Sequence, residues 1–232
     1  MKTIIDQVKI TKRAKISNIA SLGGMLLMVG CAGYSIFRPD LSKILIVGIV
    51  VGAGISMVGI YFANRWVKKP RPEASLDGAL KNLSEGYRIY HYPAFPCDHI
   101  LLTPSGVVLL ETVNLDGVFI YKDGHWKEKM SIGRAMRYIV EEYLGNPIKS
   151  VQSGAQLLRD RLKNELTVDG KVPVTPLVVF THPHALIEIH DAPIPVIPVI
   201  KLKKQIPSNL PKMSPELYQE VQALLDKMAS LS

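Results

Sequence analysis

Residues 98–113 read DHILLTPSGVVLLETV, in which two aliphatic runs surround a Pro-Ser-Gly sequence. Aliphatic runs of this length are typical of strands, and proline, serine and glycine together are typical of a tight turn. We therefore predict two strands, over 99–103 and 107–113, that pair as a hairpin. Asp98 stands at the head of the first strand and Glu111 near the end of the second. Pairing of the strands would bring these two carboxylates to one end of a sheet.

The sequence around this hairpin predicts an α/β domain. Its further elements are expected to be a short helix over 73–83, strands over 87–92 and 118–122, a helix from Pro147 to about Leu166, strands over 172–180 and 196–200, and a helix beginning at Pro215. The strands between 87 and 122 are separated by short turn signals, so we predict an antiparallel meander. Asn146 is expected to cap the helix that starts at Pro147. The predicted order is αβββαβ with additions.

Two long apolar runs precede this domain. Residues 16–37 contain no charged side chain, and neither do residues 44–64. Each run has about the 20 residues that an α-helix needs to cross the hydrocarbon core of a bilayer. The six residues that separate the runs include a Pro-Asp pair, which suits a tight turn between antiparallel helices. We therefore predict a transmembrane helical hairpin over 16–64, with the lipid bilayer as a partner.

The charge of the chain is concentrated around this predicted hairpin. The formal net charge is +8, and the first 65 residues hold eight basic and two acidic side chains. Six of the eight basic residues lie beyond the outer ends of the two apolar runs, and only Arg38 and Lys43 lie in the turn between the runs. Basic flanks are typical of the cytoplasmic side. We predict a two-span protein of the cell membrane with both termini and the soluble domain in the cytoplasm. The charge alone is therefore weak evidence for nucleic-acid binding.

These observations divide the chain into five predicted segments. They are a basic N-terminal segment over 1–15, the transmembrane hairpin over 16–64, a basic linker over 65–72, the α/β domain over 73–205 and a helical extension over 206–232. The two cysteines, Cys31 and Cys97, fall in the first apolar run and in the α/β domain. They are therefore not expected to form a disulfide bond.

From the residues alone, the role of the two carboxylates stays open. Two carboxylates at a strand end are a ligand set suited to Mg²⁺, which can activate a water molecule for attack on a phosphodiester. Such pairs are also found simply solvated or hydrogen-bonded. His182, His184 and His190 could hold zinc, although no further ligand stands at a typical spacing. Cys97 is next to Asp98, but no base for a reactive thiol can be identified.

A set of these residues resembles a known family. The matching stretches are Asp98-His99-Ile100-Leu101-Leu102, Gly106-Val107-Val108-Leu109-Leu110-Glu111, Asn114, Gly117, Asn146-Pro147 and Gln152. Over roughly residues 73–201 they resemble the nuclease-related domain (NERD) family, a branch of the PD-(D/E)XK nuclease-like superfamily. The resemblance implies a restriction-endonuclease-like core and metal-dependent phosphodiester hydrolysis. It implies that Asp98 and Glu111 bind the metal, that Gln152 is the glutamine of the catalytic helix, and that Glu73 is the acidic residue of the first helix.

The chain departs from this family at one position. The family's Glu-x-Lys is Glu111-Thr112-Val113 here, so the ammonium group that would stabilise the developing negative charge is missing. Lys122, Lys127 or Lys129 could replace it from a neighbouring strand. We therefore expect a weakened or inactive nuclease, with Mg²⁺ as its cofactor if it is active. The alternative is a non-catalytic membrane-tethered module that binds nucleic acid or a protein partner.

Overall fold

The computed structural model describes residues 1–67, 69–129, 144–168, 170–207 and 210–230. By its contacts the chain divides into two compact units. One is an α/β unit that includes residues 1–6, 72–129 and the described residues from 144 onward. The other is a helical hairpin over residues 7–71. Each unit is described by itself.

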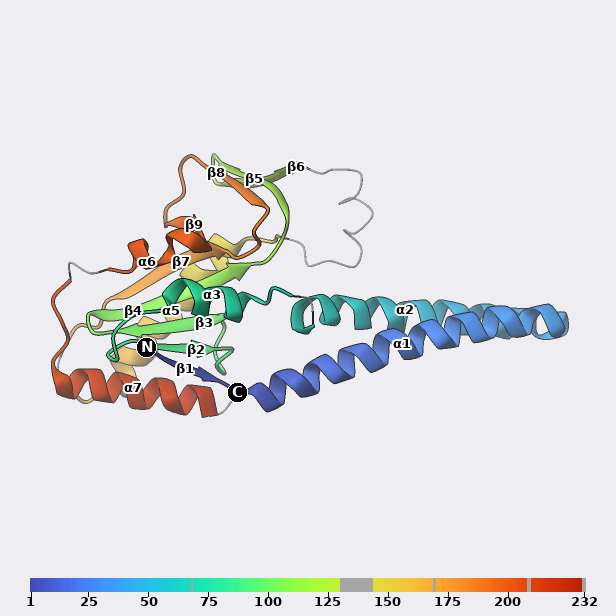
Figure 1. Cartoon of the computed structure of the whole chain (residues 1–232), viewed down its shortest axis with the longest axis horizontal. Helices are drawn as coiled ribbons and strands as arrows, with labels where there is room; N and C mark the ends of the chain where they lie inside the picture. The colour runs from blue at the N-terminus through green and yellow to red at the C-terminus, as the bar shows by residue number, and fades with distance from the viewer. Residues whose placement is uncertain (68, 130–143, 169, 208–209, 231–232) are drawn as a thin grey trace. The chain divides into compact units, whose positions relative to one another are not determined.

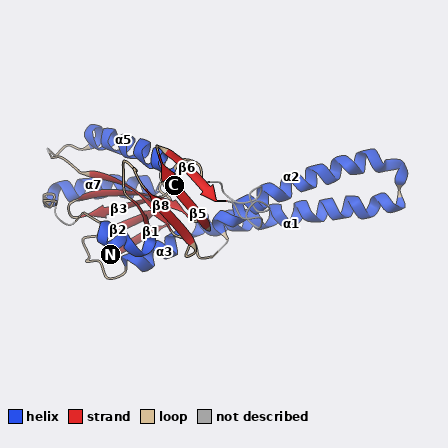
Figure 2. Ribbon diagram, turned by 90° about the horizontal axis from the view of Figure 1, so that it is seen from above, coloured by secondary structure: helices blue, strands red, loops and turns tan. Residues whose placement is uncertain are grey.

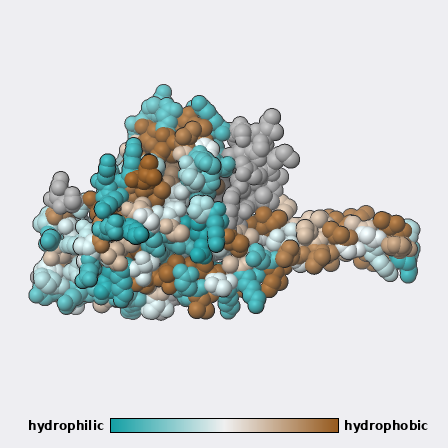
Figure 3. All heavy atoms as spheres, viewed as in Figure 1, coloured by the Kyte–Doolittle hydropathy of each residue, from teal (hydrophilic) through white to brown (hydrophobic). Residues whose placement is uncertain are grey.

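The helical unit is a hairpin of two long apolar helices, as predicted. Helix α1 (Gln7–Phe37) and helix α2 (Ser42–Trp66) are joined by a single 3-10 turn, η1 (Pro39–Leu41). Figures 1 and 2 show the two helices side by side along their length. Both are long and apolar enough to cross a membrane, and only 6% and 17% of their apolar windows are buried. This exposure distinguishes them from the core helices of a globular domain, and the brown surface of the hairpin in Figure 3 illustrates it.

Small residues let the backbones of α1 and α2 approach closely. A Cβ added to Gly24 would lie 2.4 Å from the Ser56 nitrogen, and one added to Gly59 would lie 2.3 Å from the Ser21 nitrogen. The Ser56 hydroxyl donates a hydrogen bond to the Ser21 carbonyl oxygen at 3.1 Å. Larger side chains at these glycines would therefore separate the helices. This is the small-residue packing that apolar helices use in lipid.

A six-stranded mixed sheet is the centre of the α/β unit. Its strands are β1 (Lys2–Ile5), β2 (Arg88–His91), β3 (His99–Thr103), β4 (Gly106–Val113), β7 (Val174–Phe180) and β9 (Val196–Pro198), in the order β1-β2-β3-β4-β7-β9. Strands β2, β3 and β4 are antiparallel, as expected from the turn signals. The pairs β1–β2, β4–β7 and β7–β9 are parallel. With α3 (Pro72–Leu80) and α5 (Pro147–Glu165), the observed core is the predicted αβββαβ.

Helices cover both faces of this sheet and produce two apolar cores. One core contains side chains of α5 and of α7 (Pro215–Ser230) packed on the sheet. The other contains side chains of α3 and of the short helix α6 (Leu202–Gln205). Helix α5 begins as predicted, because the Asn146 side chain accepts a hydrogen bond from the Lys149 nitrogen at 3.0 Å. A second 3-10 turn, η2 (Val199–Lys201), precedes α6. The α/β unit thus has three layers, with the sheet in the middle.

The prediction that the strand over 118–122 completes the antiparallel meander is wrong. That strand, β5 (Gly117–Lys122), lies in a separate sheet between β6 (His125–Lys129) and β8 (Ala185–Ile189). The free edge of β4 is taken instead by β7, which pairs with it over seven positions. The apolar side chains of β5 pack on the core, with the Phe119 ring 5.2 Å from the Phe180 ring. The alternating apolar side chains of β5 are therefore explained by their burial against this core and not by pairing with β4.

The N-terminal segment contains a strand that the sequence did not predict. Residues 2–5 pair in parallel with residues 88–91 of β2. The Lys2 nitrogen donates to the Tyr87 carbonyl oxygen at 2.9 Å, and the Thr3 hydroxyl donates to Asp77 of α3 at 3.0 Å. The first residues of the chain are therefore part of the α/β unit. Four residues are too few to show a strand pattern by themselves.

Candidate functional site

The structure brings Asp98 and Glu111 to the same end of the β3–β4 hairpin. The last registered pair of the two strands is His99 with Leu110, and Asp98 and Glu111 are the next residues outward on each strand. Both carboxylates are also close enough to raise the pKa of the same thiol, that of Cys97. The hairpin therefore places both residues at one end of the sheet.

Each carboxylate accepts a hydrogen bond from a different hydroxyl group. The Thr112 hydroxyl donates to Asp98 Oδ2 at 2.9 Å, and the Thr112 nitrogen lies 3.4 Å from the same oxygen. The Ser150 hydroxyl, in the first turn of α5, donates to Glu111 Oε1 at 3.0 Å. Hydroxyl donors of this kind hold a carboxylate in one orientation. The site is thus built from β3, β4 and the N-terminal turn of α5.

Cys97 is packed beneath the carboxylates and does not have the properties of a nucleophile. Burial, and then the negative charges of Asp98 and Glu111, raise the pKa of its thiol far above the ordinary range. The thiol is therefore protonated at neutral pH, and a protonated thiol is a poor nucleophile. Helix α5 approaches this loop closely, because a Cβ added to Gly154 would lie 3.0 Å from the Pro96 carbonyl oxygen.

Gln152, the glutamine that the resemblance implies for the catalytic helix, lies on α5 two positions after Ser150. It is exposed on α5, and in the described part of the chain no hydrogen bond joins it to Asp98 or Glu111. Ser150, two positions earlier, makes the helix contact with Glu111 instead. Two residues on a helix differ by about 200° in direction, so both side chains cannot face the same strand. The sequence contained no signal for Ser150, because its role depends on how α5 packs on β4.

Val113, at the position of the family's lysine, belongs to an apolar core. It is 6% exposed and lies in the cluster that includes Leu109 and side chains of α5. Lys122, Lys127 and Lys129 belong to the other sheet, on β5 and β6. Among the residues that the structure describes, none of these three lysines forms an ion pair or hydrogen bond with Asp98 or Glu111. In the described part of the chain, these three lysines therefore do not supply the missing ammonium group.

A chain of buried polar groups lies behind Asp98. The Nδ1 atoms of His91 and His99 are 2.8 Å apart, so one ring donates its proton to the other. His91 Nε2 lies 3.3 Å from Asp77 Oδ1, and His99 Nε2 lies 3.4 Å from the Thr112 hydroxyl that binds Asp98. Both histidines are buried. This chain of hydrogen bonds runs from Asp77 of α3 across β2 and β3 to Thr112 of β4, at the candidate site.

Glu73 is part of the same polar region. It is 4% exposed on α3, and its Oε2 accepts a hydrogen bond from the Tyr92 hydroxyl at 3.0 Å. The Tyr92 ring lies 4.9 Å from the His99 ring. The acidic residue of the first helix is therefore connected to the candidate site through the Tyr92 hydroxyl and the contact of its ring with His99.

The donor set fits a hard cation held mainly by water. Mg²⁺ is usually bound in proteins by one or two carboxylates, with water molecules completing its octahedron. Asp98 and Glu111 match that requirement. A search of the described residues for three or more clustered histidine, cysteine or acidic side chains finds none. The three histidines considered for zinc do not change this, since His190 contacts Glu188 at 2.9 Å while the rings of His182 and His184 lie 5.5 Å apart.

Comparison with known proteins identifies the family of this domain. The family model described as the nuclease-related domain, NERD, matches residues 71–181. No curated protein and no solved structure matches the chain. The matched stretch runs from α3 to the end of β7 and includes Asp98 and Glu111. Residues 71–181 of this chain therefore belong to the nuclease-related domain family.

Proposed function

We propose that this protein is a membrane-anchored nuclease-related protein that hydrolyses phosphodiester bonds slowly in the presence of Mg²⁺. One observation carries the proposal: Asp98 and Glu111 meet at one end of the β3–β4 hairpin, within the stretch that matches the nuclease-related domain. Carboxylates at this position would hold the metal, and a metal supplies both an activated water and neutralising charge. The substrate class is nucleic acid.

The chain's own groups have defined tasks in this proposal. Thr112 and Ser150 hold Asp98 and Glu111 in fixed orientations through these hydrogen bonds. At the position of the family's lysine, Val113 belongs to the apolar core and carries no positive charge. Loss of one such preorganised group typically lowers kcat by about 10²- to 10³-fold. The expected rate is therefore far below that of a nuclease with a complete Glu-x-Lys motif.

Membrane anchoring is proposed from the helical hairpin. Two helices long and apolar enough to span a bilayer connect β1 to the rest of the α/β unit. Because β1 pairs with β2, both ends of the hairpin must lie on the same side of a membrane, which supports two crossings. The basic residues beside the apolar runs support the cytoplasmic side.

The direct test uses the full-length protein in a neutral detergent with Mg²⁺ or Mn²⁺. Single- and double-stranded DNA and RNA would be offered, and cleavage would be followed beside an Asp98→Asn variant. Asparagine keeps the shape and can still accept from Thr112, but it removes the charge that binds metal. Asp191→Ala, at an exposed aspartate outside the site, is the matched control. Cleavage lost only in Asp98→Asn supports the proposal, and cleavage that survives this change contradicts it.

A non-catalytic binding module is the second candidate, and the burial of Val113 favours it. In that case the carboxylates have a structural task, and nucleic acid or a protein partner binds without being changed. The same samples distinguish the two functions. Saturable binding of nucleic acid with no cleavage, unchanged in Asp98→Asn, would support the module and contradict the enzyme.

A further inference from the structure

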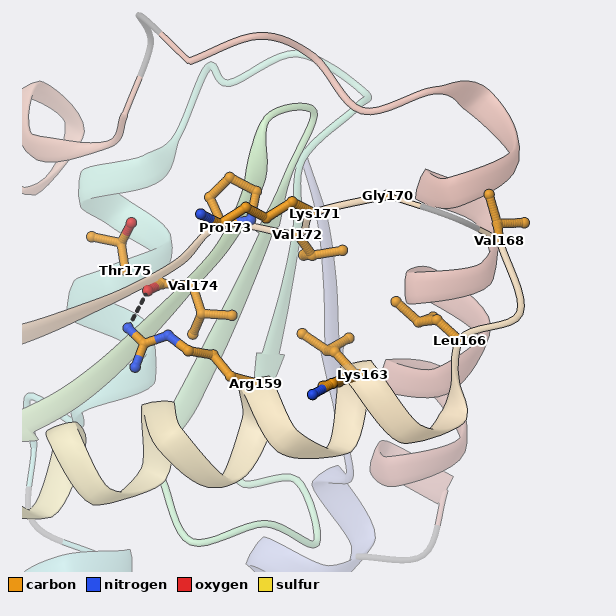
Figure 4. Close-up of a pocket in the computed structure, with 11 residues that line it drawn as sticks. Arg159, Lys163, Leu166, Val168, Gly170, Lys171, Val172, Pro173, Val174 and Thr175 are labelled. Carbon is orange, nitrogen blue, oxygen red and sulfur yellow. Dashed lines mark hydrogen bonds between the residues drawn. The ribbon is translucent and has the colours of Figure 1, made fainter.

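A second candidate site lies at the other end of α5. A cavity of about 770 Å³ opens between the C-terminal half of α5, the segment that follows it and the start of β7. Its α5 residues begin at Arg159, nine positions after Ser150, which is roughly 13 Å along the helix. Figure 4 shows the side chains that surround this cavity. The cavity is therefore separate from the carboxylates, and nothing described so far gives it a role.

Three basic side chains line the cavity. Arg159 and Lys163 are four positions apart on α5 and so share one face of the helix, and Lys171 comes from the facing segment. The Arg159 guanidinium is held in place by donating a hydrogen bond to the Val174 carbonyl oxygen at 2.8 Å (Figure 4). Among the lining residues that the structure describes, none is acidic. The three basic side chains together carry a formal charge of +3.

Asp169 lies outside the residues that the structure describes, and the acidic residues next nearest in sequence are engaged with other groups. Glu165 accepts from Arg161 at 2.6 Å, and Asp160 accepts from Gln156 at 3.0 Å. In the part of the chain that the structure describes, no carboxylate pairs with Arg159, Lys163 or Lys171. Within the described residues, their charge is thus not neutralised. Such a cluster is a complement for a ligand with several negative charges.

The remaining wall of the cavity is apolar and is held in position. Leu162, Val172 and Val174 contribute aliphatic surface. The segment that forms the far wall is attached to α7, because Glu220 accepts hydrogen bonds from the Thr167 nitrogen at 2.8 Å and the Val168 nitrogen at 3.0 Å. The cavity is therefore largely formed before any ligand binds. Pre-formed cavities of about 300–1,000 Å³ with a few polar groups are typical small-molecule sites.

We propose that this cavity binds a nucleoside diphosphate or triphosphate. The phosphates would contact Arg159, Lys163 and Lys171, since arginine and lysine are the side chains that bind phosphate oxygens. The nucleobase would pack on the aliphatic wall. A ligand of this class matches the site in size, in the number of its negative charges and in having one apolar part.

The proposal is tested by titrating ADP into the full-length protein in neutral detergent, with EDTA present, and following the heat of binding. EDTA removes any contribution of a metal at Asp98 and Glu111, so the result is independent of the proposed nuclease activity. Saturable binding that weakens with added salt is expected. A Lys163→Ala/Lys171→Ala variant should bind about tenfold more weakly, because each exposed charge contributes up to about 1 kcal/mol.

The control is Lys227→Ala, at an exposed lysine on α7 that is not among the lining residues, and it should bind ADP normally. Pyrophosphate and adenosine should each bind more weakly than ADP, since each satisfies only one part of the site. Any of three results would overturn the proposal: no saturable binding of ADP, equal binding by adenosine, or equal binding by pyrophosphate. Lys163 and Lys171 are exposed, so their replacement should leave the fold intact, as circular dichroism would verify.

Discussion

At the scale of single residues, the most consequential side chain is Val113. It follows Glu111 by two positions on β4, so both side chains extend from the same face of the strand. A lysine there would carry its ammonium group toward Glu111, but the position is nearly fully buried. A lysine at this position would therefore favour catalysis but lower the stability of the fold, because an ammonium group is costly to bury unless it is paired.

We expect a Val113→Lys variant to lose thermal stability and to gain activity. The Tm should fall because a charged group enters the apolar core, while Mg²⁺-dependent cleavage should rise by about tenfold or more through charge stabilisation. Thermal unfolding and a cleavage assay of the full-length protein would measure the two effects. Val113→Met, which adds length without charge, is the control. A folded Val113→Lys protein with unchanged cleavage would show that the missing lysine does not limit the rate.

The buried histidine pair gives a second prediction at this scale. Replacing His91 by phenylalanine removes the partner of His99 Nδ1 and should cost about 1–3 kcal/mol. Replacing both histidines should cost less than the sum of the single changes, because no buried imidazole then loses its partner. Unfolding midpoints of the two single variants and the double variant would test this. Strictly additive losses would contradict a coupled pair.

Only part of the site could be predicted from the sequence. Asp98 and Glu111 were found because the residues that pair them are close in sequence and carry a clear turn signal. Ser150 and the contact between His91 and His99 were missed. The first depends on how a helix packs on a strand, and the second on the register of β2 with β3. Neither contact is expressed in a local pattern of residue types.

At the scale of elements, the seam between α1 and α2 depends on individual glycines. Gly24 is in contact with the backbone of α2, whereas a Cβ at Gly23, one residue earlier, would have no neighbour within 4 Å. We expect Gly24→Leu to separate the helices and Gly23→Leu to have little effect. A Gly48→Cys change places a second thiol beside Cys31, so the yield of the oxidised crosslink reports the packing. Equal yields in the two leucine variants would contradict the close seam.

The wall of the basic cavity gives a prediction about pH. Hydrogen bonds from Thr167 and from the Thr167 and Val168 nitrogens lower the pKa of Glu220 below its ordinary value. A carboxyl group whose pKa is lower in the folded state contributes stability above its unfolded pKa, and this contribution is lost on acidification. The stability of the wild type should therefore fall as the pH drops below about 4.3. In Glu220→Gln the fall should be smaller, and an identical pH profile would contradict the assignment.

Elements were predictable where the sequence signal was local. The strands of the β2–β3–β4 meander and helix α5 have alternating or helical patterns bounded by turn or capping residues, and their limits agree with the structure to within a residue or two. Strand β5 was assigned to the wrong sheet, because its alternating pattern would fit any apolar surface. Its exclusion from the edge of β4 follows only from the pairing of β7 with that edge. Strands β6 and β8 were missed for the same reason, since they are stabilised mainly by pairing with β5.

At the scale of the whole molecule, the pairing of β1 with β2 restricts membrane topology. The chain before α1 and the chain after α2 contribute strands to one sheet, so they cannot be separated by a bilayer. We expect a cysteine at Lys227 to react with a membrane-impermeant maleimide only after cells are opened. A cysteine at Asp40, in the turn of the hairpin, should react in intact cells. The background would carry Cys31→Ser and Cys97→Ser, and labelling of both positions from the same side would contradict two crossings.

The same pairing sets the order in which the molecule is assembled during synthesis. Residues 2–5 leave the ribosome first, but their partners, residues 88–91, are made only after both long helices. At about 5–20 residues per second, the first strand waits for roughly 4 to 17 s without its neighbour. Both apolar helices are therefore synthesised, and must reach their final surroundings, before β1 can pair with β2. Any delay in translation between positions 6 and 88 would prolong the exposure of an unpaired edge.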